Sequence, residues 1–255
     1  MSFQQLAMEP NIPVPTLALN TADRLPLGHF YFFGMALESE ARQIARLVNQ
    51  QGLRQAIVIT AGKQLDHRLQ FAFEEEWLRL GGVIKHEIDF DNDLAVLANI
   101  PNTSNAAIFL AADAAKARMI RPYLPNKLPI YATSQVFAGN SDTLANYDMS
   151  GVHFVDMPWL LQADHPAVMT YPRPAAALST DLERFYALGI DAFRLVQLLL
   201  TGKFDVQLDG VSGKIELKGY IFQRSVVPAT FDQGQARPSN QPESHGRAPD
   251  KPPNQ

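Results

Sequence analysis

Apolar residues recur at steps of three and four near the C-terminal end of the chain, and this spacing predicts an amphipathic helix. Thr180 can cap the helix, with Glu183 reaching back, and Gly202 ends it. A stripe of this kind is typical of a helix packed on a core, so we expect one buried face. Its members are Leu182, Phe185, Tyr186, Gly189, Phe193, Val196 and Leu200. Truncation of a buried Phe185 or Tyr186 to alanine would then cost about 3–5 kcal/mol.

Helical and strand patterns alternate through the first half of the chain. Short apolar runs predict buried strands at 56–59, 106–110 and 128–132, and a period-two alternation predicts a half-solvated strand at 84–90. The amphipathic stretches between these runs predict single helices. Strands joined by single helices form right-handed βαβ units, so the sequence predicts the α/β class, with a parallel sheet flanked by helices on both faces.

The composition limits the classes of partner. The chain has 255 residues, of which 46% are hydrophobic, and this is enough for a sizeable core. The net charge is −4, from 22 basic and 26 acidic residues, so no broad attraction for nucleic acid is expected. The sequence contains no cysteine, which removes disulfides and a thiol nucleophile from consideration.

None of the common catalytic or cofactor-binding patterns is complete. Lys63 follows a glycine after a predicted strand, but Gln64 stands where a phosphate-binding loop needs Ser or Thr. The six histidines are scattered without the spacing of metal ligands, and Ser212 lacks the Gly-x-Ser-x-Gly context of a hydrolase nucleophile. We expect no catalytic residue, no metal and no cofactor. Asp191, opposite the apolar stripe, is expected to form a structural ion pair or hydrogen bond.

Several separated segments carry a family resemblance: PVPTLALN at 13–20, EAR at 40–42, YATSQVF at 131–137, GVHFVDMPWLL at 151–161, LERFYALGIDAF at 182–193 and GVSGKIEL at 210–217. In this order they resemble the C-terminal domain of the LppC/LpoA family, outer-membrane lipoproteins that activate class A penicillin-binding proteins. The resemblance covers roughly residues 12–232. No single segment would identify the family, but the combination of segments in this order does indicate it.

The resemblance implies a two-lobed, type I periplasmic-binding-protein-like fold with parallel sheets. On that template, residues 1–37 and 133–232 form the first lobe and residues 38–132 form the second. The family domain begins with further βα units, so we expect the first lobe to be incomplete. From Gln233 onward, polar residues, prolines and charges replace apolar residues, and we expect 233–255 to be a disordered tail.

The family is exported and is held by a lipid anchor at the periplasmic face of the outer membrane. The first ten residues lack the basic and apolar regions of a signal peptide, and no cysteine is present to carry a lipid. We therefore expect that the sequence is either a fragment of a longer protein or the product of a gene that has lost its 5′ part. Membrane association is expected only through the anchor that this chain lacks.

Polar residues follow two predicted strands and are candidates to line the cleft between the lobes. Ser134 and Gln135 follow one strand, and Asp156 and Trp159 lie at the end of another. The carboxyl ends of strands face the ligand crevice in open α/β sheets, so these four residues suit a binding site. The alternative is a hinge held by local hydrogen bonds, in which Pro158 sets a rigid turn and Trp159 packs beneath it.

The resemblance implies a non-enzymatic regulator of peptidoglycan synthesis, whose partner is a class A penicillin-binding protein and whose effect is stimulation of the transpeptidase. The alternative function is a module that binds a small amino-acid-like or sugar solute. Convergent charged and aromatic groups in the cleft would favour the solute, and an occluded cleft would favour a protein partner.

Overall fold

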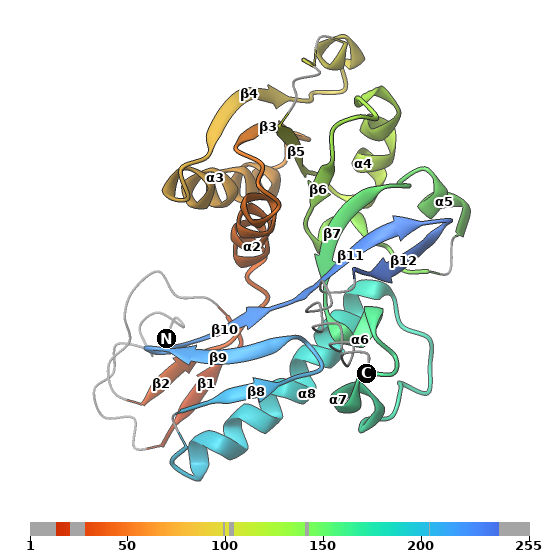
Figure 1. The fold of residues 1–255 in the computed structure, drawn as a ribbon. Coiled ribbons are helices and arrows are strands. Elements are labelled where there is room, and N and C mark those ends of the chain that lie inside the picture. Colours follow the sequence, from red (N-terminus) through yellow and green to blue (C-terminus); the bar gives the residue numbers. More distant parts are fainter. Residues whose placement is uncertain are drawn as a thin grey trace, which may run out of the picture.

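Two β-sheets form the framework of the protein (Figure 1). The computed structural model describes residues 14–20, 29–98, 100–101, 105–140, 143–203 and 205–239. The larger sheet has seven strands in the order β12 (Gln235–Pro238), β11 (Val227–Asp232), β7 (Val152–Asp156), β6 (Ile130–Ala132), β5 (Ala106–Ala111), β3 (Gln55–Thr60) and β4 (Val83–Asp89). Strands β3 to β7 pair in parallel, and β11 and β12 are antiparallel. The predicted α/β class is confirmed.

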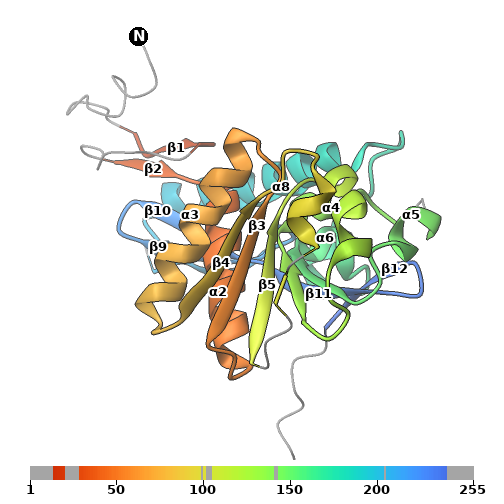
Figure 2. The same cartoon turned by 90° about the horizontal axis from the view of Figure 1, so that it is seen from above.

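Helices cover both faces of the larger sheet (Figure 2). Alternate residues of β3 point to opposite faces, so Val58 packs under the helices of one face while Ile57 packs toward the other. On the first face, Phe73 stacks on Phe109 with ring centroids 4.2 Å apart. The helical segments from the start of this region to β7 are α2 (Leu37–Gln50), α3 (Gln64–Arg79), η1 (Leu94–Leu97), α4 (Ala114–Ile120), η2 (Arg121–Tyr123), η3 (Ser134–Val136) and α5 (Thr143–Tyr147).

The smaller sheet carries the longest helix of the described chain on one face. Its strands are ordered β1 (Thr16–Ala18), β2 (Phe30–Phe32), β10 (Ile221–Ser225), β9 (Lys214–Lys218) and β8 (Gln207–Asp209). Strands β1, β2 and β10 pair in parallel, and β9 and β8 are antiparallel. The long helix, α8 (Thr180–Leu200), follows the short helices α6 (Pro158–Leu161) and α7 (Pro166–Met169). Within the described segments, no helix is both long and apolar enough to cross a membrane.

The described chain passes between the two sheets after β2, after β7 and between β10 and β11. Val226 alone separates β10 from β11, and Gln43 of α2 holds it by both backbone groups. The Gln43 side chain donates to the Val226 carbonyl at 2.7 Å and accepts from its N–H at 3.0 Å. These two hydrogen bonds therefore hold the crossing segment against α2, which packs on the larger sheet.

The lobe boundary expected after residue 132 is wrong. Strand β7 pairs in parallel with β6, so the larger sheet continues for one more βα unit before the chain crosses. Strand β11 then pairs with β7, and β12 with β11, which brings the last described strands into the same sheet. The first lobe consists instead of β1, β2 and the described segments from α8 to β10.

The first part of the tail expected to be disordered from residue 233 is an ordered strand. Gln235–Pro238 forms β12, which pairs with β11, and the hairpin turns at Gln233 and Gly234 with φ angles of 49° and 76°. Phe231 and Ala236 are buried in the core of the larger sheet. The rest of the predicted tail, 240–255, lies outside the described residues.

The predicted helix exists, but the face expected to be buried is exposed. Phe185 is 58% exposed and Phe193 is 65% exposed. The opposite face packs on the smaller sheet, where Leu188, Leu195 and Leu199 join the core around Phe222. The helix also begins one residue earlier than expected, since Ser179 is the N-cap and accepts from the Leu182 N–H at 3.4 Å.

Replacing Phe185 by alanine is therefore expected to change the free energy of unfolding by no more than about 0.5 kcal/mol, because the side chain is largely exposed. Leu188→Ala, three residues on and buried, is the matched control and is expected to cost about 2–5 kcal/mol. Urea denaturation of both variants measures the difference. Equal losses would show that α8 is rotated from the orientation described here.

Candidate functional site

Two of the four candidate cleft residues meet around a buried arginine of α8. Arg184 binds the Asp156 carboxylate, with Nη2 to Oδ2 at 2.7 Å and Nε at 3.2 Å from both oxygens. Its Nη2 also donates to the carbonyl oxygens of Ser134 at 3.0 Å and Phe137 at 2.8 Å. Burial would lower the pKa of Arg184, but the neighbouring carboxylates, Asp156 first, outweigh burial and raise it. Arg184 thus ties α8 to the carboxyl ends of β6 and β7.

A second buried ion pair lies on the other side of Ser134. Glu40, in the first turn of α2, accepts the Ser134 N–H at 3.0 Å, and its Oε1 lies 3.9 Å from Arg224 Nη2. Arg224 comes from β10 and donates through Nη1 to the Ser212 carbonyl at 3.0 Å. Burial lowers the pKa of Arg224, and the nearby Glu40, Asp156 and other charges offset only part of this effect. We call Glu40, Ser134, Asp156, Arg184 and Arg224 the hinge cluster.

Burial raises the pKa of the Glu40 carboxyl to about 6, although Arg224 opposes this. A carboxyl whose folded pKa lies above its unfolded value stabilises the fold below the unfolded pKa and loses that contribution as pH rises through the folded pKa. We expect unfolding free energy to fall by about 2 kcal/mol from this group between pH 4.5 and pH 7.

The Glu40→Gln variant is expected to lack this component, because an amide does not titrate and can still accept the Ser134 N–H. Denaturation of both proteins across the pH range measures the difference. Parallel stability curves for the two proteins would contradict the raised pKa of Glu40.

Trp159 is completely buried beside the hinge cluster rather than on a cleft wall. Its backbone N–H donates to the Val211 carbonyl at 2.9 Å, and its Nε1–H donates to the Glu183 carboxylate. The Arg173 guanidinium lies 3.9 Å from the centre of the indole ring. Pro158 stands at the first position of α6, where its fixed φ suits the start of a helix.

Gln135 is separated from the other three candidates. It is half-buried and lines a surface pocket of about 380 Å³ with residues of α4 and the first turn of α8. All three of Ser134, Asp156 and Trp159 are buried, and the Ser134 backbone, the Asp156 carboxylate and the Trp159 indole N–H contact partners from other elements. These contacts fit the hinge that the sequence left as the alternative.

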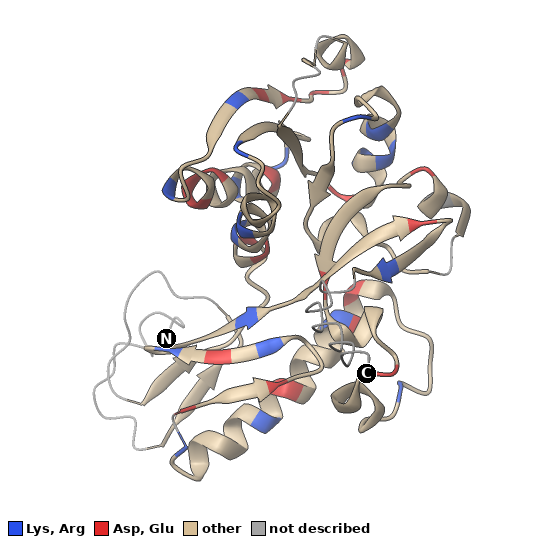
Figure 3. Ribbon diagram, in the orientation of Figure 1, with Lys and Arg blue, Asp and Glu red and all other residues tan. Residues whose placement is uncertain are grey.

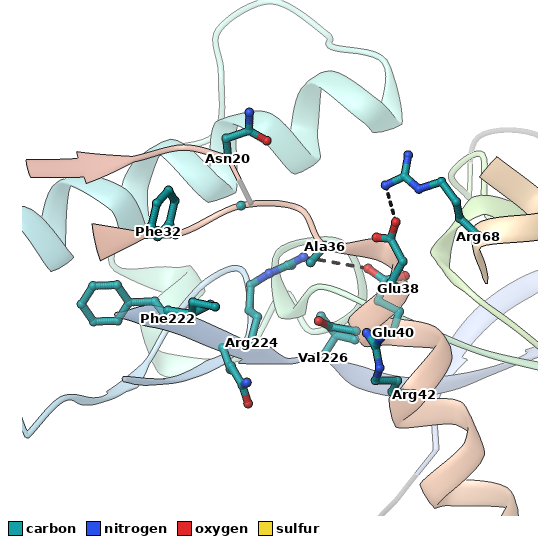
Figure 4. Close-up of a pocket in the computed structure, with 14 residues that line it drawn as sticks. Asn20, Phe32, Ala36, Glu38, Glu40, Arg42, Arg68, Phe222, Arg224 and Val226 are labelled. Carbon is teal, nitrogen blue, oxygen red and sulfur yellow. Dashed lines mark hydrogen bonds and ion pairs between the residues drawn. The ribbon is translucent and has the colours of Figure 1, made fainter. Parts of the chain in front are cut away.

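A different set of residues lines the pocket between the two sheets, which has a volume of about 640 Å³ (Figure 4). Asn20 follows β1, Phe32 ends β2, and Phe222 and Arg224 come from β10. The N-terminal turns of α2 form the opposite side. Two pairs of charged side chains lie within the lining, Arg68 with Glu38 and Arg224 with Glu40, and Arg42 pairs with Glu75 outside it.

Asp191 forms the structural contacts expected of it. It is completely buried, and its carboxylate accepts from the Ser212 N–H and Oγ–H at 2.7 Å and from the Val211 N–H at 3.2 Å. Arg194 completes the set at 2.9 Å. A side chain at Gly210 would place its Cβ 2.4 Å from the Asp191 carboxylate, so this turn requires glycine. Asp191 therefore fixes the turn between β8 and β9 on α8.

Charged residues of both signs are interspersed along the described ribbon (Figure 3). Among the residues that the structure describes, no three His, Asp or Glu side chains gather in a way that could hold a metal ion. The geometry thus offers a buried hinge cluster and, between the two sheets, a pocket whose charged side chains are paired.

This arrangement is that of periplasmic-binding-protein-like folds, and comparison with solved structures bears it out. The chain is similar to a Chromobacterium violaceum protein described as a putative branched-chain amino acid ABC transporter. The TM-score is 0.78, with 38% identity, over 89% of this chain and 75% of that chain. It is also similar to the C-domain of LpoA from Haemophilus influenzae, described as a regulator of PBP1A. That TM-score is 0.72, with 24% identity, over 88% of this chain and 74% of that chain.

The chain belongs to the family described as LppC putative lipoprotein, whose model matches residues 2–101 and 95–234. Penicillin-binding protein activator LpoA of Klebsiella pneumoniae is 23% identical over 275 residues, which span 90% of this chain. LpoA of Haemophilus influenzae is 27% identical over 189 residues, which span 71%. The matched regions are 39% and 32% of the lengths of these two relatives.

Proposed function

We propose that this chain is the periplasmic-binding-protein-like module of a penicillin-binding protein activator. It binds a class A synthase at the periplasmic side of the outer membrane and stimulates its transpeptidase without catalysing a reaction itself. The observation that carries the proposal is the match to the LppC family over nearly all of the described chain, together with relatives named as activators.

The hinge cluster supports a protein-binding role over a ligand-gated one. Closure around a solute requires the lobes to move, and motion at the hinge would separate buried charges such as Arg184 and Asp156. The charges in the pocket between the sheets are already paired. We infer a module of fixed shape that presents an outer surface to its partner.

Stimulation requires different affinities for two states of the synthase. A partner shifts a conformational equilibrium only by the difference between its binding free energies for the two conformations. The module thus binds the more active transpeptidase conformation more tightly. A coupling of 1–3 kcal/mol, typical of such effects, corresponds to a roughly 5- to 150-fold change in affinity.

The test is the rate of peptide cross-linking by a purified class A synthase, with and without a saturating amount of this chain. Saturation replaces the local concentration that a lipid anchor would provide. We expect cross-linking to rise while glycan polymerisation changes less. Unchanged cross-linking at saturation, with binding demonstrated separately, would contradict the stimulatory role.

A second function is favoured by one detail of the pocket between the sheets. Among the described residues, Arg224 Nε is buried without a hydrogen-bond partner, and Arg224 lines the pocket. Such a donor suits the carboxylate of an amino-acid-like solute. The C. violaceum structure carries a name of that kind. Thermal unfolding with branched-chain amino acids tests this alternative, which predicts a rise in melting temperature that Arg224→Lys weakens.

A further inference from the structure

Arg224 is buried in the hinge cluster with few of its donors satisfied. A guanidinium carries five N–H donors. Arg184 donates from all three of its side-chain nitrogens to carboxylate or carbonyl oxygens. Among the described contacts, Arg224 donates only from Nη1, to the Ser212 carbonyl at 3.0 Å, and its Nε is buried without a partner. Arg224 therefore has donors available for an acceptor that the described chain does not supply.

The carboxylates near Arg224 do not bind it directly. Glu40 Oε1 lies 3.9 Å from Arg224 Nη2, and both side chains line the pocket between the sheets (Figure 4). This distance is too long for a hydrogen bond. Asp191, also close to Arg224, already accepts from Arg194 and from the Ser212 N–H. Ionised Glu40 thus balances the charge of Arg224 without supplying an acceptor to its donors.

Protonation of Glu40 removes this balance. Besides Arg224, the charged groups near Glu40 are Asp156 of β7 and Arg184 of α8, and the Ser134 N–H donates to it. Asp156 is engaged by Arg184 at 2.7 Å. Once Glu40 is neutral, Arg224 is therefore a buried cation with no carboxylate of its own. A buried unpaired charge is unfavourable, so this state favours binding of an anion from the pocket.

Glu40 is able to take up a proton under mild conditions, because burial raises the pKa of its carboxyl to about 6. An anion bound at Arg224 repels the ionised carboxylate and raises this pKa further. Proton uptake strengthens anion binding by the same factor as anion binding strengthens proton uptake. The two events are therefore coupled.

The lining of the pocket defines the class of anion. Its described charged residues are three arginines and two glutamates, an excess of positive charge. Apolar residues, among them Phe222 and Val226, also line it, and its volume of about 640 Å³ exceeds the needs of an inorganic ion. A carboxylate with a short apolar tail fits this lining. An ammonium group would find no free acid there when Glu40 is protonated, because Glu38 is paired with Arg68.

We propose that the pocket between the sheets binds a small carboxylate with an apolar tail at Arg224, together with a proton on Glu40. At pH 7.5 Glu40 is ionised and such an acid binds weakly, whereas at pH 5.5 it binds well. The proposal concerns the pocket alone, so its test is independent of binding to the synthase.

Calorimetric titration of the full chain with 4-methylpentanoate, which is leucine without its ammonium group, tests the coupling. We expect at least tenfold tighter binding of the ionised acid at pH 5.5 than at pH 7.5. At pH 7.5, buffers of different ionisation enthalpy are expected to reveal uptake of about one proton per ligand. Leucine is the matched control and is expected to bind at least tenfold more weakly at pH 5.5. Equal affinities at the two pH values, or no binding at either, would overturn the proposal.

Two variants of the lining locate the proton. Glu40→Gln is uncharged at both pH values, so it is expected to bind 4-methylpentanoate at pH 7.5 as tightly as the wild type does at pH 5.5. Glu38→Gln, from the same lining, is expected to keep the wild-type pH dependence. A Glu40→Gln variant that kept the full pH dependence would overturn the proposal.

Arg224→Met is expected to lose binding at both pH values, with circular dichroism confirming that it is folded. Wild-type affinity in the folded variant would place the carboxylate elsewhere and overturn the proposal. Should this variant fail to fold, the pH dependence of Glu40→Gln decides the outcome by itself.

Discussion

Replacing Arg184 by methionine is expected to lower the free energy of unfolding by about 3–5 kcal/mol. The substitution leaves the Asp156 carboxylate buried without its partner and removes the donor shared by Ser134 and Phe137. Methionine retains much of the side-chain volume, so the loss reports the ion pair more than a cavity. Chemical denaturation followed by circular dichroism measures it.

Asp181→Ala is the matched control for this variant. Asp181 also pairs with Arg184, at 2.6 Å, but its side chain is exposed. Its removal is expected to cost less than about 1 kcal/mol. The double variant R184M/D156L is expected to recover part of the loss, because it leaves no buried unpaired charge. An R184M protein as stable as the wild type would refute the structural importance of the hinge cluster.

Replacing Asp191 by alanine is also expected to cost about 3–5 kcal/mol. The variant leaves the buried N–H groups of Val211 and Ser212 without an acceptor and deprives Arg194 of its partner. The turn between β8 and β9 then keeps only the hydrogen bond from Arg194 to the Asp209 carbonyl as its polar attachment to α8 among the described contacts. Thermal or chemical unfolding of the purified variant measures the loss.

Asp191→Asn provides the graded comparison. Its single side-chain oxygen can accept from Ser212 but does not replace both carboxylate oxygens, so we expect a loss of about half that of Asp191→Ala. Exchange of the Ser212 amide hydrogen is expected to accelerate in both variants. Full protection of this amide in the alanine variant would show that another group holds the turn.

The sequence predicted α8 but not its orientation, for a reason visible in its residues. Two apolar stripes run along this helix: one through Phe185 and Phe193, and another through Leu188, Leu195 and Leu199. Periodicity locates a helix but does not distinguish between two apolar faces. Asp191 lies on the second stripe, and a carboxylate there suggests an exposed face. The structure buries it because the turn between β8 and β9 supplies hydrogen-bond donors to it.

The alternation of strands and helices predicted the larger sheet well, whereas its edge could not be predicted. β11 joins β7 from more than 70 residues away and β12 pairs with β11, and local pattern carries no information on the long-range pairing. The family template placed the boundary one βα unit too early, because it assigned β7 to the first lobe although β7 pairs with β6.

The sequence pointed to two of the five residues of the hinge cluster. Ser134 and Asp156 drew attention because polar residues follow the ends of strands, a position with a structural meaning in α/β sheets. Glu40, Arg184 and Arg224 were missed because each looks like an ordinary charged residue on a helix or strand. Only the fold shows that they are buried together.

Calorimetric titration of this chain tests the central claim most directly, with a purified class A synthase in one experiment and branched-chain amino acids in another. The proposed role predicts saturable binding to the synthase and no heat of binding with the amino acids. Saturable binding of an amino acid, with no binding to the synthase, would contradict it and would assign the pocket between the sheets to a solute.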